Sequence, residues 1–244
     1  MVEFRVLGPL EVRDRGEVVP VKARSLLAAL LLSANKVVTV DHLVGAVWGD
    51  DPPESAVANL RNQVVVIRRL GARVVTCPGG YSLQVGPGEL DLEVFEDMVR
   101  QGRRMARRHR HAAAAGLFGR ALELWRGPAL ANVELRGTTR AAAARLGEAR
   151  MTVVEEWARS GLACGAKDVA GELTGLVIEH PLREPLWALL MLALHRAGRR
   201  ADALAAYERA RRVLADELGL DPGLELRRLR HQIITDDPAL LCSA

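Results

Sequence analysis

The sequence predicts a mainly α-helical protein with a small β component, arranged as two domains. Three observations support this prediction. Alternating apolar and polar residues, typical of strands, are confined to the first 88 residues. The turn at Gly86–Gly88 marks a boundary, and every later segment has helical periodicity. The length of 244 residues leaves room for two modest domains, which we place at residues 1–88 and 89–244.

The composition fits a globular protein whose positive charge comes from arginine. Hydrophobic residues make up 49% of the chain and charged residues 26%, which argues against a disordered or membrane-embedded protein. Among the 34 basic residues only Lys22, Lys36 and Lys167 are lysines, and the forked guanidinium of arginine suits phosphate and carboxylate. The net charge of +4 permits a polyanionic partner but does not require one.

The sequence contains no motif for membrane insertion, secretion or catalysis. No apolar run approaches the roughly 20 residues of a membrane span, and the first five residues lack the pattern of a secretory signal, so we expect a cytoplasmic protein without a membrane partner. Cys77, Cys164 and Cys242 share no CxxC spacing, and neither GxSxG, HExxH nor a phosphate-binding loop occurs. We therefore expect no enzymatic activity, no cofactor and no metal.

Two clusters of titratable residues have ordinary explanations. His109 and His111 are expected in a helix, where a spacing of two points them to different faces, and the surrounding arginines would repel a cation. Asp50 and Asp51 precede two prolines, where capping and turn formation explain them better than acid–base chemistry. Neither cluster predicts a catalytic or metal site.

The N-terminal domain is expected to contain short strands, three helices and a hairpin. Alternating apolar residues from Phe4 to Val12 predict the opening strands, followed by a turn at Asp14–Gly16 before Val18 and Val19. Thr39 is a good N-cap for the second helix, and the segment 50–53 ends it. The expected elements are a helix over 22–34, a helix over 39–49, a helix from about 54 to 70, and a β-hairpin over 73–83 that turns at 78–80.

The C-terminal domain is expected to be all-α and to contain a tandem repeat. Residues 150–183 and 184–217 look like two copies of a 34-residue helix-turn-helix unit, the period of tetratricopeptide repeats. In the first copy, Pro181 occupies the closing position. The second copy carries the residues typical of that repeat: Trp187, Leu190, Leu194, Gly198, Ala203, Tyr207 and Ala210. Such repeats bind proteins more often than they catalyse reactions.

The helix expected from 54 to 70 has the pattern of a helix that reads DNA. Val57, Leu60, Val64 and Ile67 form an apolar face that should dock on the first two helices. The opposite face carries asparagine and arginine, which recognise adenine and guanine. Its members are Ala58, Asn62, Val65, Val66 and Arg69, flanked by Asn59, Arg61 and Arg68. The alternative is that this face is simply solvated. Two valines facing water need an explanation, however, and either contact with thymine methyl groups or burial against the C-terminal domain would supply one.

A capped helix before this helix and a hairpin after it complete a winged helix-turn-helix. The segments FRVLGPLEV (4–12), ANKVVTVDHLVGAVWGDDPPESAVANLRNQ (34–63) and PGGYSL (78–83) resemble the OmpR-type DNA-binding domain of the Streptomyces antibiotic regulatory protein family. Residues 180–233 resemble that family's bacterial transcriptional activation domain. The resemblance covers nearly the whole chain. It implies an N-terminal winged helix-turn-helix followed by an all-α, tetratricopeptide-like helical domain, as in the family's small form.

The resemblance implies a sequence-specific, DNA-binding transcriptional activator, pathway-specific for a secondary-metabolite (antibiotic) cluster. Such a protein binds direct repeats in promoter double-stranded DNA, with a second copy of itself head to tail, and recruits RNA polymerase holoenzyme including its sigma factor. It would be cytoplasmic and associated with the nucleoid. One alternative is a helical-repeat scaffold whose degenerate winged helix binds protein rather than DNA. Another is a DNA-binding protein without sequence preference.

The resemblance also assigns DNA contacts within this chain. The reading helix contributes Asn59, Arg61, Asn62, Gln63, Val66, Arg68 and Arg69. Contacts to the DNA backbone come from Lys22 and Arg24 before the first helix and from Thr76, Gly80 and Tyr81 in the wing. The family usually has an arginine where Val66 stands, a small polar residue where Val65 stands and an arginine where Cys77 stands. The target sequence or affinity should therefore differ from the family's usual behaviour.

A run of arginines just past the domain boundary could compensate for this lost charge. Arg100, Arg103, Arg104, Arg107, Arg108 and Arg110 occur with no acid between Asp97 and Glu123. In a helix, all but Arg110 would line one face. Arg103, Arg104, Arg107 and Arg108 are therefore candidate contacts to the DNA backbone beside the wing, and a solvated helix face is the alternative.

Overall fold

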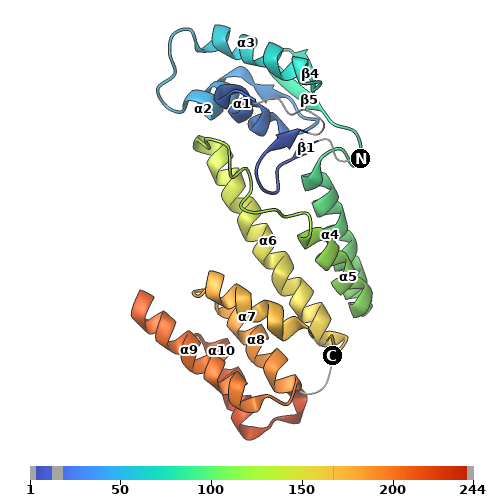
Figure 1. Cartoon of the computed structure of the whole chain (residues 1–244), viewed down its shortest axis with the longest axis vertical. Coiled ribbons are helices and arrows are strands. Elements are labelled where there is room, and N and C mark those ends of the chain that lie inside the picture. The colour runs from blue at the N-terminus through green and yellow to red at the C-terminus, as the bar shows by residue number, and fades with distance from the viewer. Residues whose placement is uncertain (1–3, 13–18, 167, 241–244) are drawn as a thin grey trace. The chain divides into compact units, whose positions relative to one another are not determined.

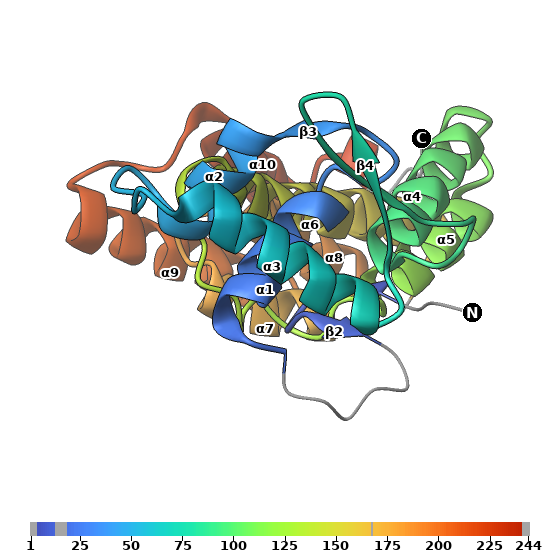
Figure 2. The ribbon, with the colours of Figure 1, turned by 90° about the horizontal axis from the view of Figure 1, so that it is seen from above.

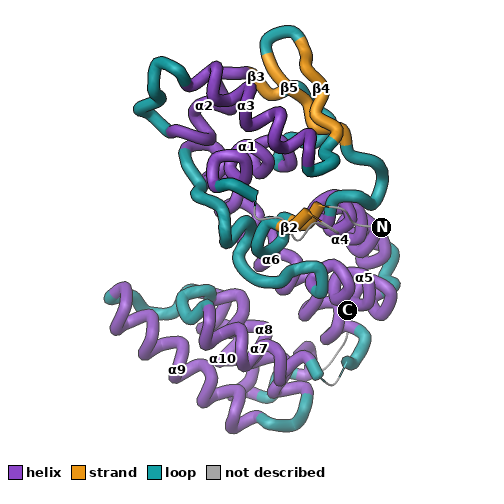
Figure 3. The backbone as a smooth tube through the Cα atoms, turned by 45° about the horizontal axis from the view of Figure 1, so that its top comes forward, coloured by secondary structure: helices purple, strands orange, loops and turns teal. Residues whose placement is uncertain are grey.

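The computed structural model describes residues 4–12, 19–166 and 168–240. It is mainly helical, and its strands are short and lie near the N-terminus (Figures 1 and 3). The chain forms two compact units: the first contains Met1–Val99 and Arg120–Met151, and the second contains Arg100–Gly119 and Thr152–Ala244. The predicted fold class is therefore confirmed, whereas packing groups part of the predicted C-terminal domain with the N-terminal one.

The first unit begins with β1 (Phe4–Arg5) and β2 (Glu11–Val12), an antiparallel pair in which Phe4 opposes Val12. These are the predicted opening strands, while the predicted turn at 14–16 and Val18 lie outside the described residues. The segment after β1 is held by later parts of the chain, because Val6 N donates to Asp91 Oδ1 at 2.8 Å and Arg126 N donates to Leu7 O at 2.8 Å. The division into domains at residue 88 consequently stays a proposal.

Three helices follow: α1 (Val21–Leu31), α2 (Val40–Trp48) and α3 (Ala56–Arg69). The hydroxyl of Thr39 accepts a hydrogen bond from His42 N at 3.3 Å, so Thr39 caps α2 as predicted. Helix α1 is buried from Ser25 to Leu31 because leucine and alanine occupy all of its faces there. Helix α3 packs against both α1 and α2 (Figure 2), which gives the arrangement of a helix-turn-helix.

The hairpin consists of β4 (Arg73–Cys77) and β5 (Gly80–Gln84), in antiparallel pairing as predicted. A short strand that the sequence analysis missed, β3 (Val38–Thr39), pairs with β5 on its other side, so the sheet order is β3-β5-β4. A Cβ atom at Gly80 would lie 2.0 Å from Val38 O. The close approach of β3 and β5 thus requires glycine at this position.

The helices after the sheet are α4 (Asp91–Arg107), α5 (His111–Leu122) and α6 (Gly137–Ala163), and each of the three contributes residues to both units. The prediction that His109 lies in a helix is wrong. His109 has a left-handed φ of +56° in the turn that ends α4, and His111 begins α5. Arg108 and Arg110 also lie outside α4, so the predicted helical face of arginines ends at Arg107.

The rest of the second unit consists of α7 (Val169–Glu179), α8 (Glu184–Arg196), α9 (Arg200–Leu218), α10 (Leu224–Thr235) and a 3-10 turn (Pro238–Leu240). The pair α8–α9 coincides with the predicted second repeat, and the end of α6 with α7 forms the first. Trp187 and Tyr207 are buried, and Trp187 Nε1 donates to Pro181 O at 2.8 Å. None of the helices in the described ranges is long and apolar enough to cross a membrane.

Candidate nucleic-acid interface

Helix α3 buries one face and presents the other. Leu60, Val64 and Ile67 are buried as predicted, but Val57 is 43% exposed and Ala56 is buried in its place. The assignment of Val57 to the apolar face is therefore wrong. The positions at Ala56, Leu60, Val64 and Ile67 follow the repeat of three and four residues that one helix face requires, and Val57 falls one residue outside it.

The outer face of α3 is basic and contains no acid. The helix carries Arg61, Arg68 and Arg69 and neither aspartate nor glutamate. Arg61, Asn62 and Arg69 are exposed, and Val65 is 44% exposed. Asn59, Gln63 and Val66 are half-buried. A surface of guanidinium, carboxamide and small apolar groups offers the contacts that base edges and thymine methyl groups accept.

Arg68 joins the end of α3 to the wing. Its Nε donates to Val74 O at 2.9 Å, and its Nη2 donates to the hydroxyl of Thr76 at 2.9 Å. Two of the five donors of this guanidinium are thus used inside the fold. Arg68 and Thr76 were both predicted to contact DNA, and the structure brings them together as a pair that fixes strand β4 against α3.

The other predicted wing residues are less accessible. Gly80 and Tyr81 are buried in β5, where Tyr81 stands opposite Val38 on one side and Thr76 on the other. Thr76 is exposed, and Cys77, at the position where the family usually has an arginine, is half-buried. Of the three predicted wing contacts, Thr76 alone therefore presents an open side chain.

Lys22 and Arg24, which were predicted to precede the first helix, lie within α1, so that placement is wrong, and both have local partners. The ammonium of Lys22 lies 5.3 Å from the centre of the Trp48 ring, a cation–π distance. Arg24 Nη1 donates to Asn132 O at 2.9 Å, and its Nη2 donates to Val19 O at 3.0 Å. Arg24 therefore already serves to hold the loop around residue 132, whereas Lys22 remains exposed.

The predicted ridge of arginines is partly neutralised. Arg103 Nε lies 2.9 Å from Glu156 Oε1, and both residues belong to the second unit. Arg104, Arg107 and Arg108 are exposed. The contribution of this ridge to an electrostatic surface thus depends on three arginines rather than four.

A buried carboxylate fixes the start of α4. Asp91 is 2% exposed and accepts hydrogen bonds from Val6 N and Leu7 N, while Arg126 Nη2 lies 3.7 Å away. Burial raises the pKa of Asp91, although the backbone hydrogen bonds and Arg126 act in the opposite direction. Nearby, the hydrogen bond from Gly86 N lowers the pKa of Glu89, and Arg73 adds to this effect. No sequence pattern predicted the hydrogen bonds from Val6 and Leu7 to Asp91, which we call the Asp91 clasp, because these partners are about 85 residues apart in the sequence.

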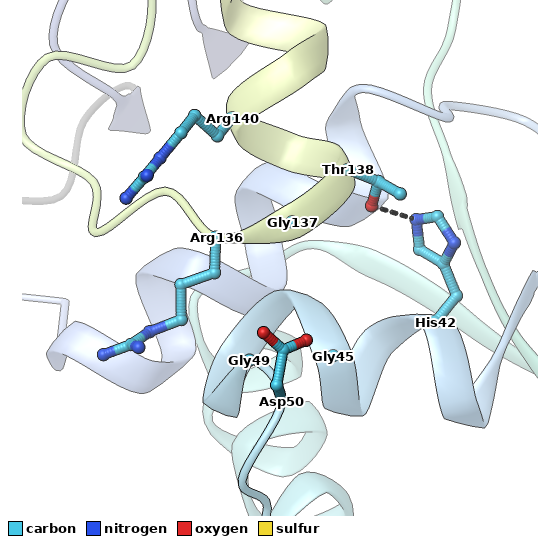
Figure 4. A pocket seen from close by; sticks show the side chains of 8 residues that line it. All are labelled: His42, Gly45, Gly49, Asp50, Arg136, Gly137, Thr138 and Arg140. Atoms are coloured by element: carbon cyan, nitrogen blue, oxygen red, sulfur yellow. Dashed lines mark hydrogen bonds between the residues drawn. The ribbon is translucent and has the colours of Figure 1, made fainter.

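A cavity of about 390 Å³ lies beside α2 and the start of α6 (Figure 4). His42 Nε2 and the hydroxyl of Thr138 are 3.0 Å apart at one side of it. Asp50 and Arg136 lie on the other side, and Arg136 pairs with Glu134. The cavity combines opposite charges, and in the described residues no group of three or more histidine, cysteine, aspartate or glutamate side chains could hold a metal. We interpret this cavity as a gap left where the start of α6 packs against α2, and we assign no ligand to it.

Comparison with known proteins gives one family. The bacterial transcriptional activator domain matches residues 90–234. Regulatory protein DnrI of Streptomyces peucetius is 36% identical over 98% of this chain and 94% of its own length. Transcriptional regulator RedD of Streptomyces coelicolor is 34% identical over 98% of this chain and 72% of its own length.

A solved structure agrees with these sequences. Mycobacterium tuberculosis EmbR, in complex with a low-affinity phosphopeptide, shares 34% identity, covers 97% of this chain and has a TM-score of 0.88. This chain spans 66% of that structure, and it matches 25% of Regulatory protein AfsR of Streptomyces coelicolor, at 40% identity. The acid-free α3, its attached wing and the helical repeats thus occur in a sequence that belongs to the Streptomyces antibiotic regulatory protein family of DNA-binding transcriptional activators.

Proposed function

We propose that this protein recognises direct repeats in promoter DNA through the exposed face of α3 and recruits RNA polymerase holoenzyme to them. One observation carries the proposal: α3 presents Arg61, Asn62 and Arg69 without a single acid, next to a wing that Arg68 holds in place. A reading helix that is fixed by its wing enters the major groove with little loss of conformational freedom. Two copies would bind head to tail, because direct repeats have no two-fold axis.

The names of the relatives support a role in regulating transcription, and the proposal adds that this role is specific to one biosynthetic pathway. DnrI is named a regulatory protein and RedD a transcriptional regulator, and both come from Streptomyces species. The matched domain is described as a transcriptional activator domain. The proposal includes residues 1–88 as the DNA-binding domain and 89–244 as the activation domain, and the family match from residue 90 supports this division. The protein would act in the cytoplasm at the nucleoid, with no catalytic role.

The departures at Val66 and Cys77 give this protein its own binding preference. Each arginine missing from a base contact removes about 1–3 kcal/mol of discrimination, and each missing phosphate contact lowers the salt slope by about one. The half-buried side chains of both residues add no charge to the interface. We therefore expect a target that differs from those of the arginine-containing relatives.

The experiment combines gel shifts and nuclease footprinting on promoter DNA from neighbouring operons and on unrelated duplex, at about 50 and 200 mM salt. We expect a complex that survives the higher salt on one promoter only, with two protected segments about one or two helical turns apart. Binding that vanishes with salt on every sequence would refute the proposal.

A scaffold that binds protein through its winged helix is the second candidate. Arg24 and Arg68 favour the scaffold, because both were predicted to contact DNA and both donate hydrogen bonds to backbone carbonyls within the protein instead. Association with polymerase in the absence of any duplex-DNA binding would establish this candidate instead.

A further inference from the structure

Among the described residues of the second unit, most of the large apolar side chains that are exposed lie at one end. The α7–α8 turn and the α9–α10 turn lie together there, because α8 leads away from this end and α9 returns to it. Glu184 Oε2 joins the two turns by accepting a hydrogen bond from Gly223 N at 2.7 Å. In the described part of this unit, five of six exposed large apolar residues are found here, with 44% to 73% of each residue exposed. We call them the leucine end: Ile178, Leu182, Leu218, Leu220 and Leu224.

The backbone under these side chains is firmly held. Gly219 ends α9 with a left-handed φ of +66°, and Leu220 N donates to Leu214 O at 3.3 Å. Pro222 is buried, and a Cβ atom at Gly223 would lie 3.0 Å from the carboxylate of Glu184. The exposed leucines therefore belong to a preformed surface, and a partner loses little conformational entropy in ordering it.

Acidic residues flank this apolar surface on the side of the two turns. Five carboxylates in and beside the two turns are exposed: Glu179, Asp216, Glu217, Asp221 and Glu225. The basic residue within the α7–α8 turn, Arg183, pairs with Glu155 at 2.8 Å. Arg227 and Arg228 lie beyond Leu224 and line a cavity of about 430 Å³ on α10 together with it, so the charge changes sign on that side. Such asymmetry fixes the orientation of a partner of complementary charge.

We propose that the leucine end docks a segment of RNA polymerase holoenzyme whose apolar side chains are flanked by lysine or arginine. This inference rests on the proposed function for the identity of the partner. The apolar anchors would cover the exposed leucines, and the flanking cations would meet the carboxylates near Leu218 and Leu220. Exposed apolar clusters with a polar rim mark protein interaction sites rather than DNA sites, because acidic side chains repel phosphate.

The test compares three variants of the full chain. The first is the triple variant Leu218→Ser, Leu220→Ser and Leu224→Ser, and the second is Glu217→Lys with Asp221→Lys. The matched control is Ile234→Ser, which changes an exposed apolar residue at the opposite end of α10. Circular dichroism and promoter gel shifts establish that each variant is folded and binds DNA as the unchanged protein does.

Transcription is then measured in vitro with purified holoenzyme, together with binding of holoenzyme to the protein without DNA. We expect the triple variant to lose activation and holoenzyme affinity by about 30-fold, the size of a lost hot spot. The charge variant should lose about fivefold, with a weaker salt dependence, and the control should change neither quantity. Normal activation by the folded triple variant would overturn the proposal.

The partner is also tested directly. If the unchanged protein sediments as a dimer that the triple variant dissociates, while holoenzyme affinity stays the same, the leucine end joins two copies of this chain and the proposal is wrong. Failure of the unchanged protein to bind promoter DNA would overturn the proposed function alone. Binding of holoenzyme in the absence of DNA would still test whether the leucine end docks the polymerase.

Discussion

The outer face of α3 and the leucine end are two exposed surfaces among the described residues, and they differ in chemistry. The first presents arginine and asparagine without acids, while the second presents leucine and isoleucine among carboxylates. Both rest on a fixed backbone: Arg68 ties α3 to the wing, and Glu184 ties the α7–α8 turn to Gly223. The comparison teaches that the two units carry surfaces of different chemistry, a basic one suited to a polyanion and an apolar, acidic one suited to a protein, and that a bridging polar side chain holds each in shape.

The largest expected effect is that of Gly80→Ala, which separates strand β5 of the wing from β3. A Cβ atom 2.0 Å from Val38 O forces β3 and β5 apart, so the first unit should lose about 3 kcal/mol of stability. Thermal unfolding measures the loss, and DNA binding should fall with it. The control is Gly79→Asn, because a Cβ atom there meets nothing within 4 Å and asparagine tolerates the φ of +75°. Equal melting temperatures for the unchanged protein and Gly80→Ala would contradict this role.

Arg61→Ala addresses the binding surface itself. Removal of this exposed guanidinium should cost about 2 kcal/mol of specific DNA binding, or about 30-fold in Kd, and leave the melting temperature unchanged. Titrations with promoter DNA measure the affinity. Val57→Ala is the control, since Val57 is exposed one turn before Arg61 on α3 and carries no charge. An affinity for promoter DNA equal to that of the unchanged protein would remove Arg61 from the interface.

Asp91→Asn tests the clasp at the start of α4. The amide keeps one acceptor for Val6 N and Leu7 N, so we expect a loss of about 1–2 kcal/mol in unfolding free energy. Because burial raises the pKa of Asp91, the folded state binds this proton more tightly than the unfolded state. The contribution of Asp91 to stability is therefore largest below its ordinary pKa of 3.8 and falls as the pH rises through the raised value.

Denaturant titrations of both proteins at several pH values from about 3 upward check this sign. The difference in unfolding free energy between the unchanged protein and Asp91→Asn should shrink as the pH rises. A difference that grows with pH would mean that the hydrogen bonds and Arg126 outweigh burial.

Thr76→Val gives the smallest effect and concerns the bond between α3 and the wing. Loss of the hydroxyl leaves Arg68 Nη2 without this acceptor at an exposed site, so stability should change by about 0.5–1 kcal/mol. DNA affinity should fall slightly as the wing loosens. Thr235→Val, at an exposed hydroxyl on α10 in the other unit, is the matched control. An effect on activation without any effect on DNA binding would contradict the assignment of this bond to the DNA surface.

Local signals in the sequence predicted much of this fold. Thr39 as the cap of α2, the hairpin around Gly79 and the repeat around Trp187 depend on neighbouring residues, and all three are confirmed. Long-range pairing was not predictable. Strand β3 is only two residues long and forms by pairing with β5. The hydrogen bonds of Asp91 join residues about 85 positions apart in the sequence.

The candidate DNA interface was predictable in outline for the same reason. The helical repeat of α3 placed Leu60, Val64 and Ile67 correctly. Val57 was misplaced because α3 begins at Ala56, and in the first turn Ala56 rather than Val57 points into the core. The burial of Tyr81 and the engagement of Arg24 and Arg68 follow from partners that sequence spacing does not reveal.

The central claim is that α3 reads base pairs, and Asn62→Ala tests it most directly. Affinities of the unchanged protein and of this variant are measured for the promoter site and for a set of sites with single base-pair changes. We predict that Asn62→Ala loses discrimination at one base pair, by about 1–3 kcal/mol, and keeps it at the others. Uniformly weaker binding to every site, or unchanged discrimination at all of them, would contradict the claim.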